Sequence, residues 1–344
     1  MRLRALRADA RESALEEWER SGIRAVAEAE RILSDPSSDL AKEADRVTIV
    51  EAQGVWKRYG GFDAVKDVSF ALQSGEILGM VGPNGAGKTT IIRMLLDILQ
   101  PDRGRFLLFG QPFAHEHRAM LGYLPEERGL YRDLRVQQTL EYLGKLKGMA
   151  VADARRRTGE ALERLGMLEH RDKKIKELSR GMAQLIQLAA TILHKPRLLV
   201  LDEPFSGLDP VNLRMVKDLL RELRDQDVAI ILSTHQINQV EELCDRVLMI
   251  NRGTVVLYGS LDEVRRDFGE GSIIVEVSRL PEALPGVDKV IQQGDHHELV
   301  MSDGASSQAV LRALMESEVE VRRFQVAGLP LDEIFVRIVK GAGQ

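Results

Sequence analysis

The glycine-rich stretch Gly82-Pro-Asn-Gly-Ala-Gly-Lys88-Thr89 constrains this chain most, because it matches the pattern GxxxxGK[ST] in full. An apolar run, GEILGMVG, leads into it, and TTIIRMLLDIL continues from it with the spacing of a helix. Strand, glycine-rich turn and helix in this order predict a phosphate-binding loop, since glycine lets backbone N–H groups close around phosphate oxygens. The helix presents the positive end of its dipole to the same anion.

The side chains of this loop have separate expected roles in binding a nucleotide. Lys88 is expected to reach the β- and γ-phosphates, and Thr89 is expected to ligate Mg²⁺. Because a strand precedes the loop and a helix follows it, a chance glycine turn is disfavoured. The residues predicted to bind the nucleotide here are Gly82, Pro83, Asn84, Gly85, Ala86, Gly87, Lys88, Thr89 and Thr90.

A second apolar run, residues 198–201, ends in two adjacent carboxylates, Asp202 and Glu203. Carboxylates at the end of a buried strand are costly unless they serve a site. In a protein with a phosphate-binding loop, Asp202 is expected on Mg²⁺, and Glu203 is placed to polarise the attacking water as general base. Taken alone, the pair could equally cap a strand; beside a complete phosphate-binding loop, the catalytic interpretation is favoured.

Apolar strands and helices alternate through the middle of the chain. The run VAIILSTH follows RLLVLDEP after a predicted helix over residues 211–225, and residues 131–195 are predicted to be mostly helical. This alternation predicts a parallel α/β core. Ahead of the phosphate-binding loop, VTIVEAQGVWKRYG and KDVSFAL alternate as strands do and predict an antiparallel sheet.

Changes in composition divide the chain into three predicted parts. Residues 1–46 are rich in Ala, Arg and Glu; they form a charged helical extension, a frayed segment, or a stretch upstream of an alternative start at Val47. Residues 47–270 form the α/β nucleotide-hydrolysing domain, with a helical subdomain at about residues 130–195. Residues 271–344 have their own strand and helix pattern and predict a small α+β accessory domain.

Three further motifs accompany the phosphate-binding loop and the acidic pair. Residues 178–182, LSRGM, precede the acidic strand; residues 206–209, SGLD, follow it; and His235 ends the strand VAIILSTH. In this order, the motifs resemble those of the nucleotide-binding subunit of an ABC transporter. The resemblance covers roughly residues 47–265 and implies an ATPase that binds ATP with Mg²⁺.

The motif at residues 178–182 stands where this family has its LSGGQ signature. It departs from the signature at the third and fifth positions, Arg180 and Met182, while Ser179 and Gly181 remain. The resemblance implies that Ser179 and Gly181 touch the γ-phosphate of ATP across a dimer interface. A serine and a glycine before a helix are also a common cap, so this motif is weak in isolation.

The resemblance assigns roles to three more residues. Tyr59, in VWKRYGG, matches the aromatic that stacks on adenine. His235 matches the switch histidine, which joins Glu203 and Lys88 as a catalytic group. Asp209 belongs to the D-loop at the dimer interface.

Glu126, in GYLPEERGLY, occupies the place where most family members carry glutamine. The resemblance therefore implies a carboxylate where an amide oxygen normally meets Mg²⁺ and the attacking water. The alternative is that Glu126 points to solvent or pairs with Arg128. The sequence leaves both open.

The resemblance also implies partners. Two subunits, either two copies or this chain and a homologous motor, are expected to face head to tail and close on two ATP molecules, coupling hydrolysis to transport by separate permease subunits. The chain would lie on the cytoplasmic face of the membrane, and the segment after Glu126 would contact the permease. The PEERGLY variant, the altered signature and the C-terminal unit resemble the sodium and multidrug exporter subfamily.

Composition and motif spacing disfavour other functions. The net charge of -5 argues against a dedicated nucleic-acid binder, and no stretch approaches the ~18 apolar residues of a membrane span. The single cysteine, Cys244, suits a reducing compartment. The alternative is a soluble ABC-type ATPase acting on nucleic acid or the ribosome. It is disfavoured because the chain has one phosphate-binding loop and little room before Leu178 for a coiled coil.

Overall fold

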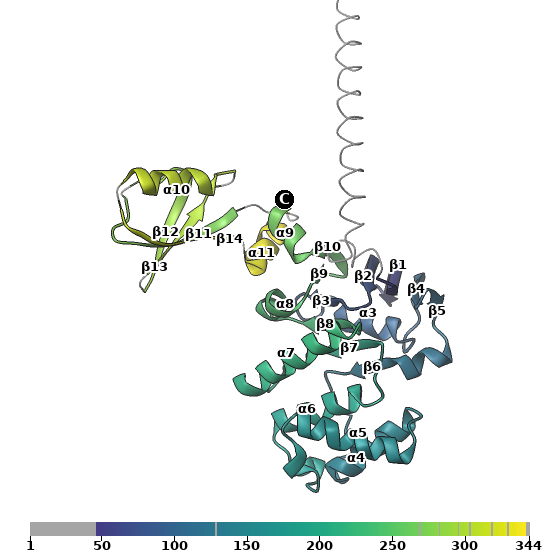
Figure 1. Cartoon of the computed structure of the whole chain (residues 1–344). Helices are drawn as coiled ribbons and strands as arrows, with labels where there is room; N and C mark the ends of the chain where they lie inside the picture. The colour runs from purple at the N-terminus through teal and green to yellow at the C-terminus, as the bar shows by residue number, and fades with distance from the viewer. Residues whose placement is uncertain are drawn as a thin grey trace, which may run out of the picture. The chain divides into compact units, whose positions relative to one another are not determined.

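The computed structural model describes residues 46–341 except residues 128, 268–269, 282, 295, 303, 318 and 329. The extension predicted over residues 1–46 therefore lies outside the described residues, apart from Arg46. The elements described below all belong to the unit Thr48–Gln344 (Figure 1).

A six-stranded sheet in the order β10-β9-β3-β8-β7-β6 forms the centre of the fold. Strands β9, β3, β8, β7 and β6 are parallel, and β10 joins one edge antiparallel to β9. The predicted parallel α/β core is confirmed, whereas β6, β9 and the antiparallel edge strand were not predicted from the sequence. The strands are β3 (Ile77–Val81), β6 (Leu121–Leu124), β7 (Leu198–Asp202), β8 (Ala229–Thr234), β9 (Arg246–Asn251) and β10 (Thr254–Ser260).

Alternate residues of the central strands enter two different hydrophobic cores. Every residue of β3, β7 and β8 is buried, as expected for a sheet covered on both faces. Leu78 and Met80 belong to the core beneath the N-terminal strands and α3 (Lys88–Leu95), whereas Ile77 and Val81 belong to the core on the opposite face. Successive side chains of a strand point to opposite faces, so the continuous apolar run serves both layers.

The N-terminal strands form the antiparallel sheet that the sequence predicts, in the order β2-β1-β4-β5. Its first two strands make a hairpin in which Tyr59 lies opposite Phe62. Phe70 and Phe106 are buried against each other with ring centroids 6.4 Å apart, and they join the core that also holds α3. The strands are β1 (Thr48–Tyr59), β2 (Phe62–Gln73), β4 (Arg103–Leu108) and β5 (Gln111–Pro112).

Helices α4, α5 and α6 form the predicted helical subdomain (Figure 1), in which α4 and α5 pack together while α6 also contacts β6 of the central sheet. Ser179 is the N-cap of α6, where its hydroxyl accepts the Met182 N–H at 3.2 Å. Two side chains fasten this subdomain to the start of β6, since Lys147 Nζ and His194 Nε2 each lie 2.9 Å from the Leu121 carbonyl oxygen. The helices are α4 (Val136–Leu146), α5 (Val151–Arg164) and α6 (Arg180–Ile192).

The C-terminal region forms an antiparallel sheet in the order β12-β13-β11-β14, with α10 packed on one face. Val310 and Leu314 of α10 bury themselves against Ile273 and Leu299 of the sheet, so this unit has its own small hydrophobic core. The α+β expectation is confirmed. The elements are β11 (Glu270–Val277), β12 (Val287–Gln293), β13 (His296–Met301), α10 (Ser307–Glu316) and β14 (Val321–Gly328). The preceding helix, α9 (Leu261–Asp267), buries Leu261 and Val264 in the larger core of the chain.

The last helix, α11 (Leu331–Gly341), packs on the nucleotide-hydrolysing part of the chain. Leu331 and Ile334 are fully buried and share a core with Val240 of α8 (Ile237–Leu243). The Leu331 N–H also donates to Glu241 Oε1 of α8 at 2.8 Å. The sequence grouped this helix with residues 271–344, but its buried residues belong to the larger core and not to the core of the C-terminal sheet. α7 (Pro210–Asp225) packs in the same core.

Replacing Leu331 by alanine should therefore destabilise the nucleotide-hydrolysing domain. Leu→Ala changes in a packed core typically lower the free energy of unfolding by about 2–5 kcal/mol. We expect Leu331→Ala to lower it by an amount in that range. Val336 lies on the same helix but is 44% exposed, so Val336→Ala is the matched control. Urea unfolding followed by circular dichroism measures both changes. Equal effects in the two variants would contradict the docked position of α11.

Candidate active site

The phosphate-binding loop connects β3 to α3, as the sequence predicts. Gly87 is the N-cap of α3 and has a φ of 110°, in the region that favours glycine. A Cβ atom at Gly87 would lie 2.6 Å from the Ala64 carbonyl oxygen, and one at Gly82 would lie 2.2 Å from that of Ile250. Both positions therefore require glycine, because neighbouring backbone fills the space that a side chain would take.

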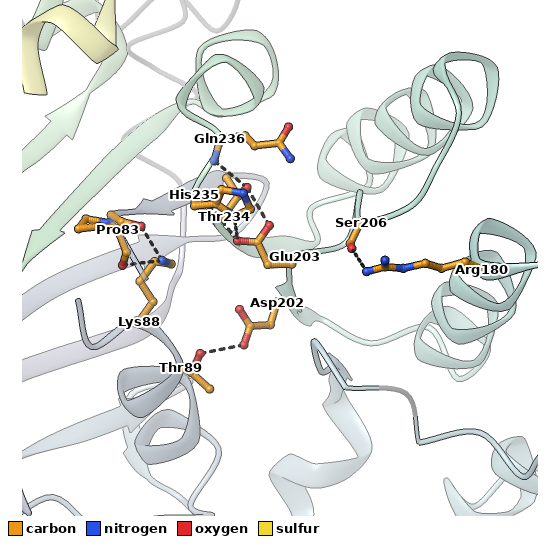
Figure 2. Close-up of polar contacts among 11 residues, drawn as sticks. Pro83, Lys88, Thr89, Arg180, Asp202, Glu203, Ser206, Thr234, His235 and Gln236 are labelled. Atoms are coloured by element: carbon orange, nitrogen blue, oxygen red, sulfur yellow. Dashed lines mark hydrogen bonds and ion pairs between the residues drawn. The ribbon is translucent and has the colours of Figure 1, made fainter. Parts of the chain in front are cut away.

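Lys88 is buried at the mouth of this loop and turns back toward it (Figure 2). Its Nζ donates to the carbonyl oxygens of Gly82 at 2.6 Å and Pro83 at 3.3 Å. Burial lowers the pKa of Lys88, and the nearby carboxylates, Glu203 first and Asp202 next, oppose that shift. The Lys88 ammonium group thus lies between backbone carbonyl acceptors and the acidic pair, at the place where a phosphate and its metal ion would bind.

Thr89 and Asp202 meet across the end of the sheet (Figure 2). The Thr89 hydroxyl donates to Asp202 Oδ2 at 3.2 Å. Asp202 is 2% exposed, and burial raises the pKa of its carboxyl group, while its hydrogen bond from Thr89 acts in the opposite direction. Hydroxyl and carboxylate oxygens are the ligands that Mg²⁺ prefers, so this pair fits a magnesium site.

Glu203 and His235 form a second pair, positioned by neighbouring strands (Figure 2). Because β7 and β8 run parallel side by side, their carboxyl ends bring the two residues together. Glu203 Oε1 accepts a hydrogen bond from the backbone N–H of His235 at 2.9 Å and lies 2.7 Å from the ring nitrogen Nδ1 of His235. The Thr234 hydroxyl donates to Glu203 Oε2 at 3.2 Å. Both carboxylate oxygens are therefore held in place.

The backbone at Glu203 is strained. Its φ of 49° lies in the left-handed region, which is costly for a residue with a side chain and persists only where the surroundings fix it. Here the Glu203 N–H donates to the Ser233 carbonyl oxygen of β8 at 2.9 Å. Strain of this kind is concentrated at functional sites, which agrees with the role predicted for Glu203.

An open pocket of about 410 Å³ brings most of the predicted residues together. It contains Tyr59, the phosphate-binding loop, Glu126 and the acidic pair, and it also contains Phe62 and Ala64, which the sequence analysis did not single out. Phe62 is 61% exposed and pairs with Tyr59 across the β1–β2 hairpin, so two aromatic rings border the pocket. The lining residues are Tyr59, Phe62, Ala64, Asn84, Gly85, Ala86, Gly87, Lys88, Thr89, Thr90, Glu126, Asp202 and Glu203.

Three residues with predicted roles lie elsewhere in the described part of the chain. Ser179 and Gly181 begin α6, and Asp209 is the N-cap of α7, where its Oδ1 accepts the N–H groups of Val211 and Asn212 at 3.0 Å. None of the three is among the residues lining the pocket. Ser179 and Asp209 are exposed, so each is available to a second molecule while capping its own helix.

These features define a nucleoside triphosphatase with a phosphate-binding loop, a buried acidic strand end and a paired Glu–His. The ABC transporter family matches residues 65–206. The family described as "ATP-binding protein DrrA1-3-like, C-terminal domain" matches residues 259–339. The chain belongs to the ATP-binding proteins of ABC transporters, in the DrrA-like group with a C-terminal domain.

Several relatives support this assignment over most of the chain. The uncharacterized ABC transporter ATP-binding protein YhaQ of Bacillus subtilis is 36% identical over 83% of this chain and 96% of its own length. The daunorubicin/doxorubicin resistance ATP-binding protein DrrA of Streptomyces peucetius is 31% identical, over 84% and 92%. The linearmycin resistance ATP-binding protein LnrL of Bacillus subtilis is 34% identical, over 68% and 77%.

A solved structure of an ATP-binding subunit of an ABC transporter has the same fold. It superposes with a TM-score of 0.61 at 29% identity and covers 64% of this chain and 93% of that one. The chain is thus an ABC ATPase, which binds ATP and hydrolyses it to drive transport, and the transporter hypothesis is confirmed over its nucleic-acid alternative. Among the residues that the structure describes, no helix combines the length and the apolar character needed to cross a membrane.

Proposed function

We propose that this chain is the motor of an exporter that removes antibiotic-like small molecules through separate permease subunits. The observation that carries the proposal is the match of residues 259–339 to the DrrA1-3-like C-terminal domain. Two relatives, DrrA and LnrL, are named for resistance to daunorubicin or doxorubicin and to linearmycin. Resistance by a transporter implies outward movement of the compound, so export is favoured over import.

In this function, each side chain of the pocket in this subunit has a defined task. The backbone of the phosphate-binding loop and Lys88 hold the β- and γ-phosphates. Thr89, Asp202 and Glu126 would hold Mg²⁺, which when bound neutralises charge on those phosphates. Glu203 accepts the proton of the attacking water, and His235 fixes the orientation of the Glu203 carboxylate through its ring and its N–H.

The second half of each site comes from another subunit. Ser179 and Gly181 begin α6 outside the pocket that contains Lys88, so they complete an ATP site only when a second motor subunit faces this one. An arrangement in which each subunit supplies the same two surfaces is isologous and closes as a dimer. ATP then forms part of the interface and favours the closed dimer by mass action.

The permease is expected to dock beside the segment that follows Glu126. Tyr131 and Tyr142 are both exposed there and contact each other edge to face, with ring centroids 5.6 Å apart. Leu134 and Leu146 are also exposed nearby on the helical subdomain. A group of exposed apolar side chains favours a protein contact. Docking to a permease would hold the chain at the cytoplasmic face of the membrane.

Glu126 should make ATP binding unusually dependent on Mg²⁺. Glu126 lines the pocket with Thr89 and Asp202, and its charge, with those of Glu203 and Asp202, opposes the lowering of the Lys88 pKa by burial. A carboxylate binds a hard cation more tightly than an amide does, but without the metal it repels the γ-phosphate. In a Mg²⁺ titration of ATP affinity, the unsubstituted chain should therefore respond more steeply than Glu126→Gln.

The adjacent acid provides the control for this titration. Glu127 is exposed and does not line the pocket, so Glu127→Gln should behave as the unsubstituted chain does. If Glu126→Gln and the unsubstituted chain show the same Mg²⁺ dependence, Glu126 does not face the metal. The alternative of an Arg128 pair involves a residue outside the described part of the chain.

The export proposal is tested with the chain and a candidate permease chosen from the neighbouring reading frames, expressed together. The two proteins should co-purify, and inside-out membrane vesicles should take up daunorubicin or a related antibiotic only when ATP is supplied. Vesicles carrying Glu203→Gln are the control and should show no uptake. ATP-driven solute uptake into intact cells that express the chain and its permease would reject the proposal. A permease that never associates with the chain would also reject it.

A further inference from the structure

Arg180 links the start of α6 to the loop that follows Glu203 within the same subunit. Arg180 stands at the third position of the signature, where the LSGGQ pattern has glycine. Its Nη2 donates to Ser206 Oγ at 3.1 Å (Figure 2). In that view the pair lies on the side of Glu203 away from Lys88. The glycine that the LSGGQ pattern has at this position would have no side chain to make this hydrogen bond.

The rest of the Arg180 side chain packs on the same loop. Gly207 has a φ of 77°, and a Cβ there would lie only 3.0 Å from Arg180 Cγ and 3.1 Å from Cδ. A Cβ on Gly181 would lie 2.8 Å from the Gly207 carbonyl oxygen. The start of α6 therefore lies against the loop through the backbone at Gly181 and Gly207 and through the aliphatic part of the Arg180 side chain, in addition to the hydrogen bond.

Gln184 makes a second contact of the same kind one helical turn further on. It is 4% exposed, and its Nε2 donates to the Pro204 carbonyl oxygen at 3.1 Å. Residues four apart lie on one face of a helix, so Arg180 and Gln184 fasten one face of α6 to the loop at residues 204–206. The face of α6 that carries Arg180 and Gln184 thus packs against the turn that begins at Glu203.

The same loop is tied directly to Glu203. The Ser206 N–H donates to the Glu203 carbonyl oxygen at 3.2 Å, which closes a turn immediately after the acidic strand. Ser206 is therefore joined by a hydrogen bond to the strained backbone of Glu203. Through Arg180, the position of Ser179 and Gly181 becomes linked to the position of Glu203.

We propose that Arg180 is a positioning residue for ATP hydrolysis: it holds the signature helix against the Glu203 turn, so that the surface offered to the partner's ATP and this subunit's own general base move as one unit. The inference rests on the proposed dimer. It concerns coupling between the two ATP sites, and no contact of Arg180 with a nucleotide is required. Loss of Arg180 should affect turnover and leave the half-site that binds ATP unchanged.

The test is a double-mutant cycle on Arg180 and Ser206 in the full chain. Arg180→Met keeps much of the stem but removes the donor, and Ser206→Ala removes the acceptor. Each should lower kcat about tenfold, since a small misplacement of catalytic groups has large effects on rate, with ATP affinity unchanged within about twofold. The double variant should be no slower than either single variant, because both remove one interaction.

Two further variants complete the design. Arg156 is an exposed arginine of the same subdomain that pairs with Asp153 and Glu160, so Arg156→Met should retain full kcat. Arg180→Lys keeps a donor and should recover most of the kcat that Arg180→Met loses. Unfolding midpoints of all variants separate lost positioning from lost stability.

The outcomes distinguish this inference from the proposed function. A slow Arg180→Met beside a fully active Ser206→Ala would show that Arg180 does not act through Ser206 and would overturn the positioning role. Full activity in both variants, or an Arg180→Lys as slow as Arg180→Met, would also overturn it. If Glu203→Gln, in which hydrolysis no longer opens the dimer, showed no ATP-dependent dimer, the proposed dimer would fail instead.

Discussion

Replacing Glu203 by glutamine should lower ATP turnover by about 10²–10⁴-fold, the usual effect of removing a general base, and should leave ATP binding intact. Glutamine has the same shape, so its amide oxygen can still accept the His235 N–H that now lies 2.9 Å from Glu203 Oε1. What is lost is the capacity to take a proton from water. The phosphate-binding loop and Lys88 are unchanged, so the nucleotide is still held.

The same variant should accumulate an ATP-bound dimer, because closure needs ATP whereas opening needs hydrolysis. Single-turnover kinetics measure the chemical step, and light scattering with and without ATP measures the dimer. Glu163 is an exposed acid on α5, and Glu163→Gln is a matched control that should turn over normally. Turnover in Glu203→Gln equal to that of the control would refute the assignment of Glu203.

The local elements of this fold were predictable because their signals are local. The all-apolar β3 and the glycines of the loop follow from sequence, since only glycine fits the left-handed backbone of Gly87 and the space beside it. By contrast, β6 is short and directly follows a 3-10 helix (His115–Met120), and its place beside β7 is visible only in the structure. Pairing between distant strands leaves little mark on a single sequence.

The contacts between distant segments were the least predictable part. The amphipathic spacing of Leu331 and Ile334 predicts a helix. It does not predict that the Leu331 backbone N–H donates a hydrogen bond to Glu241, which is distant in sequence. In the active site, Glu203 and His235 were each identified, and their contact depends on β7 and β8 being neighbours. The predicted metal, catalytic and dimer roles of individual residues remain predictions that the variants above address.

Single substitutions in either half of the composite site should nearly abolish hydrolysis. Lys88→Ala removes the cation that lies at the mouth of the phosphate-binding loop, so that subunit loses its hold on the γ-phosphate. Ser179→Arg places a large side chain at the exposed start of α6 and blocks the surface offered to the partner. The lost cap costs about 0.5–2 kcal/mol, so the subunit should remain folded.

Mixing these two inactive subunits tests the central claim, that each ATP site is shared between two chains. In a heterodimer, one site combines the intact phosphate-binding loop of the Ser179→Arg subunit with the intact Ser179 of the Lys88→Ala subunit, while the other site carries both defects. If one intact site suffices, ATPase activity should rise above that of either variant alone. No rise, in a mixture where mass spectrometry demonstrates heterodimers, would contradict the account.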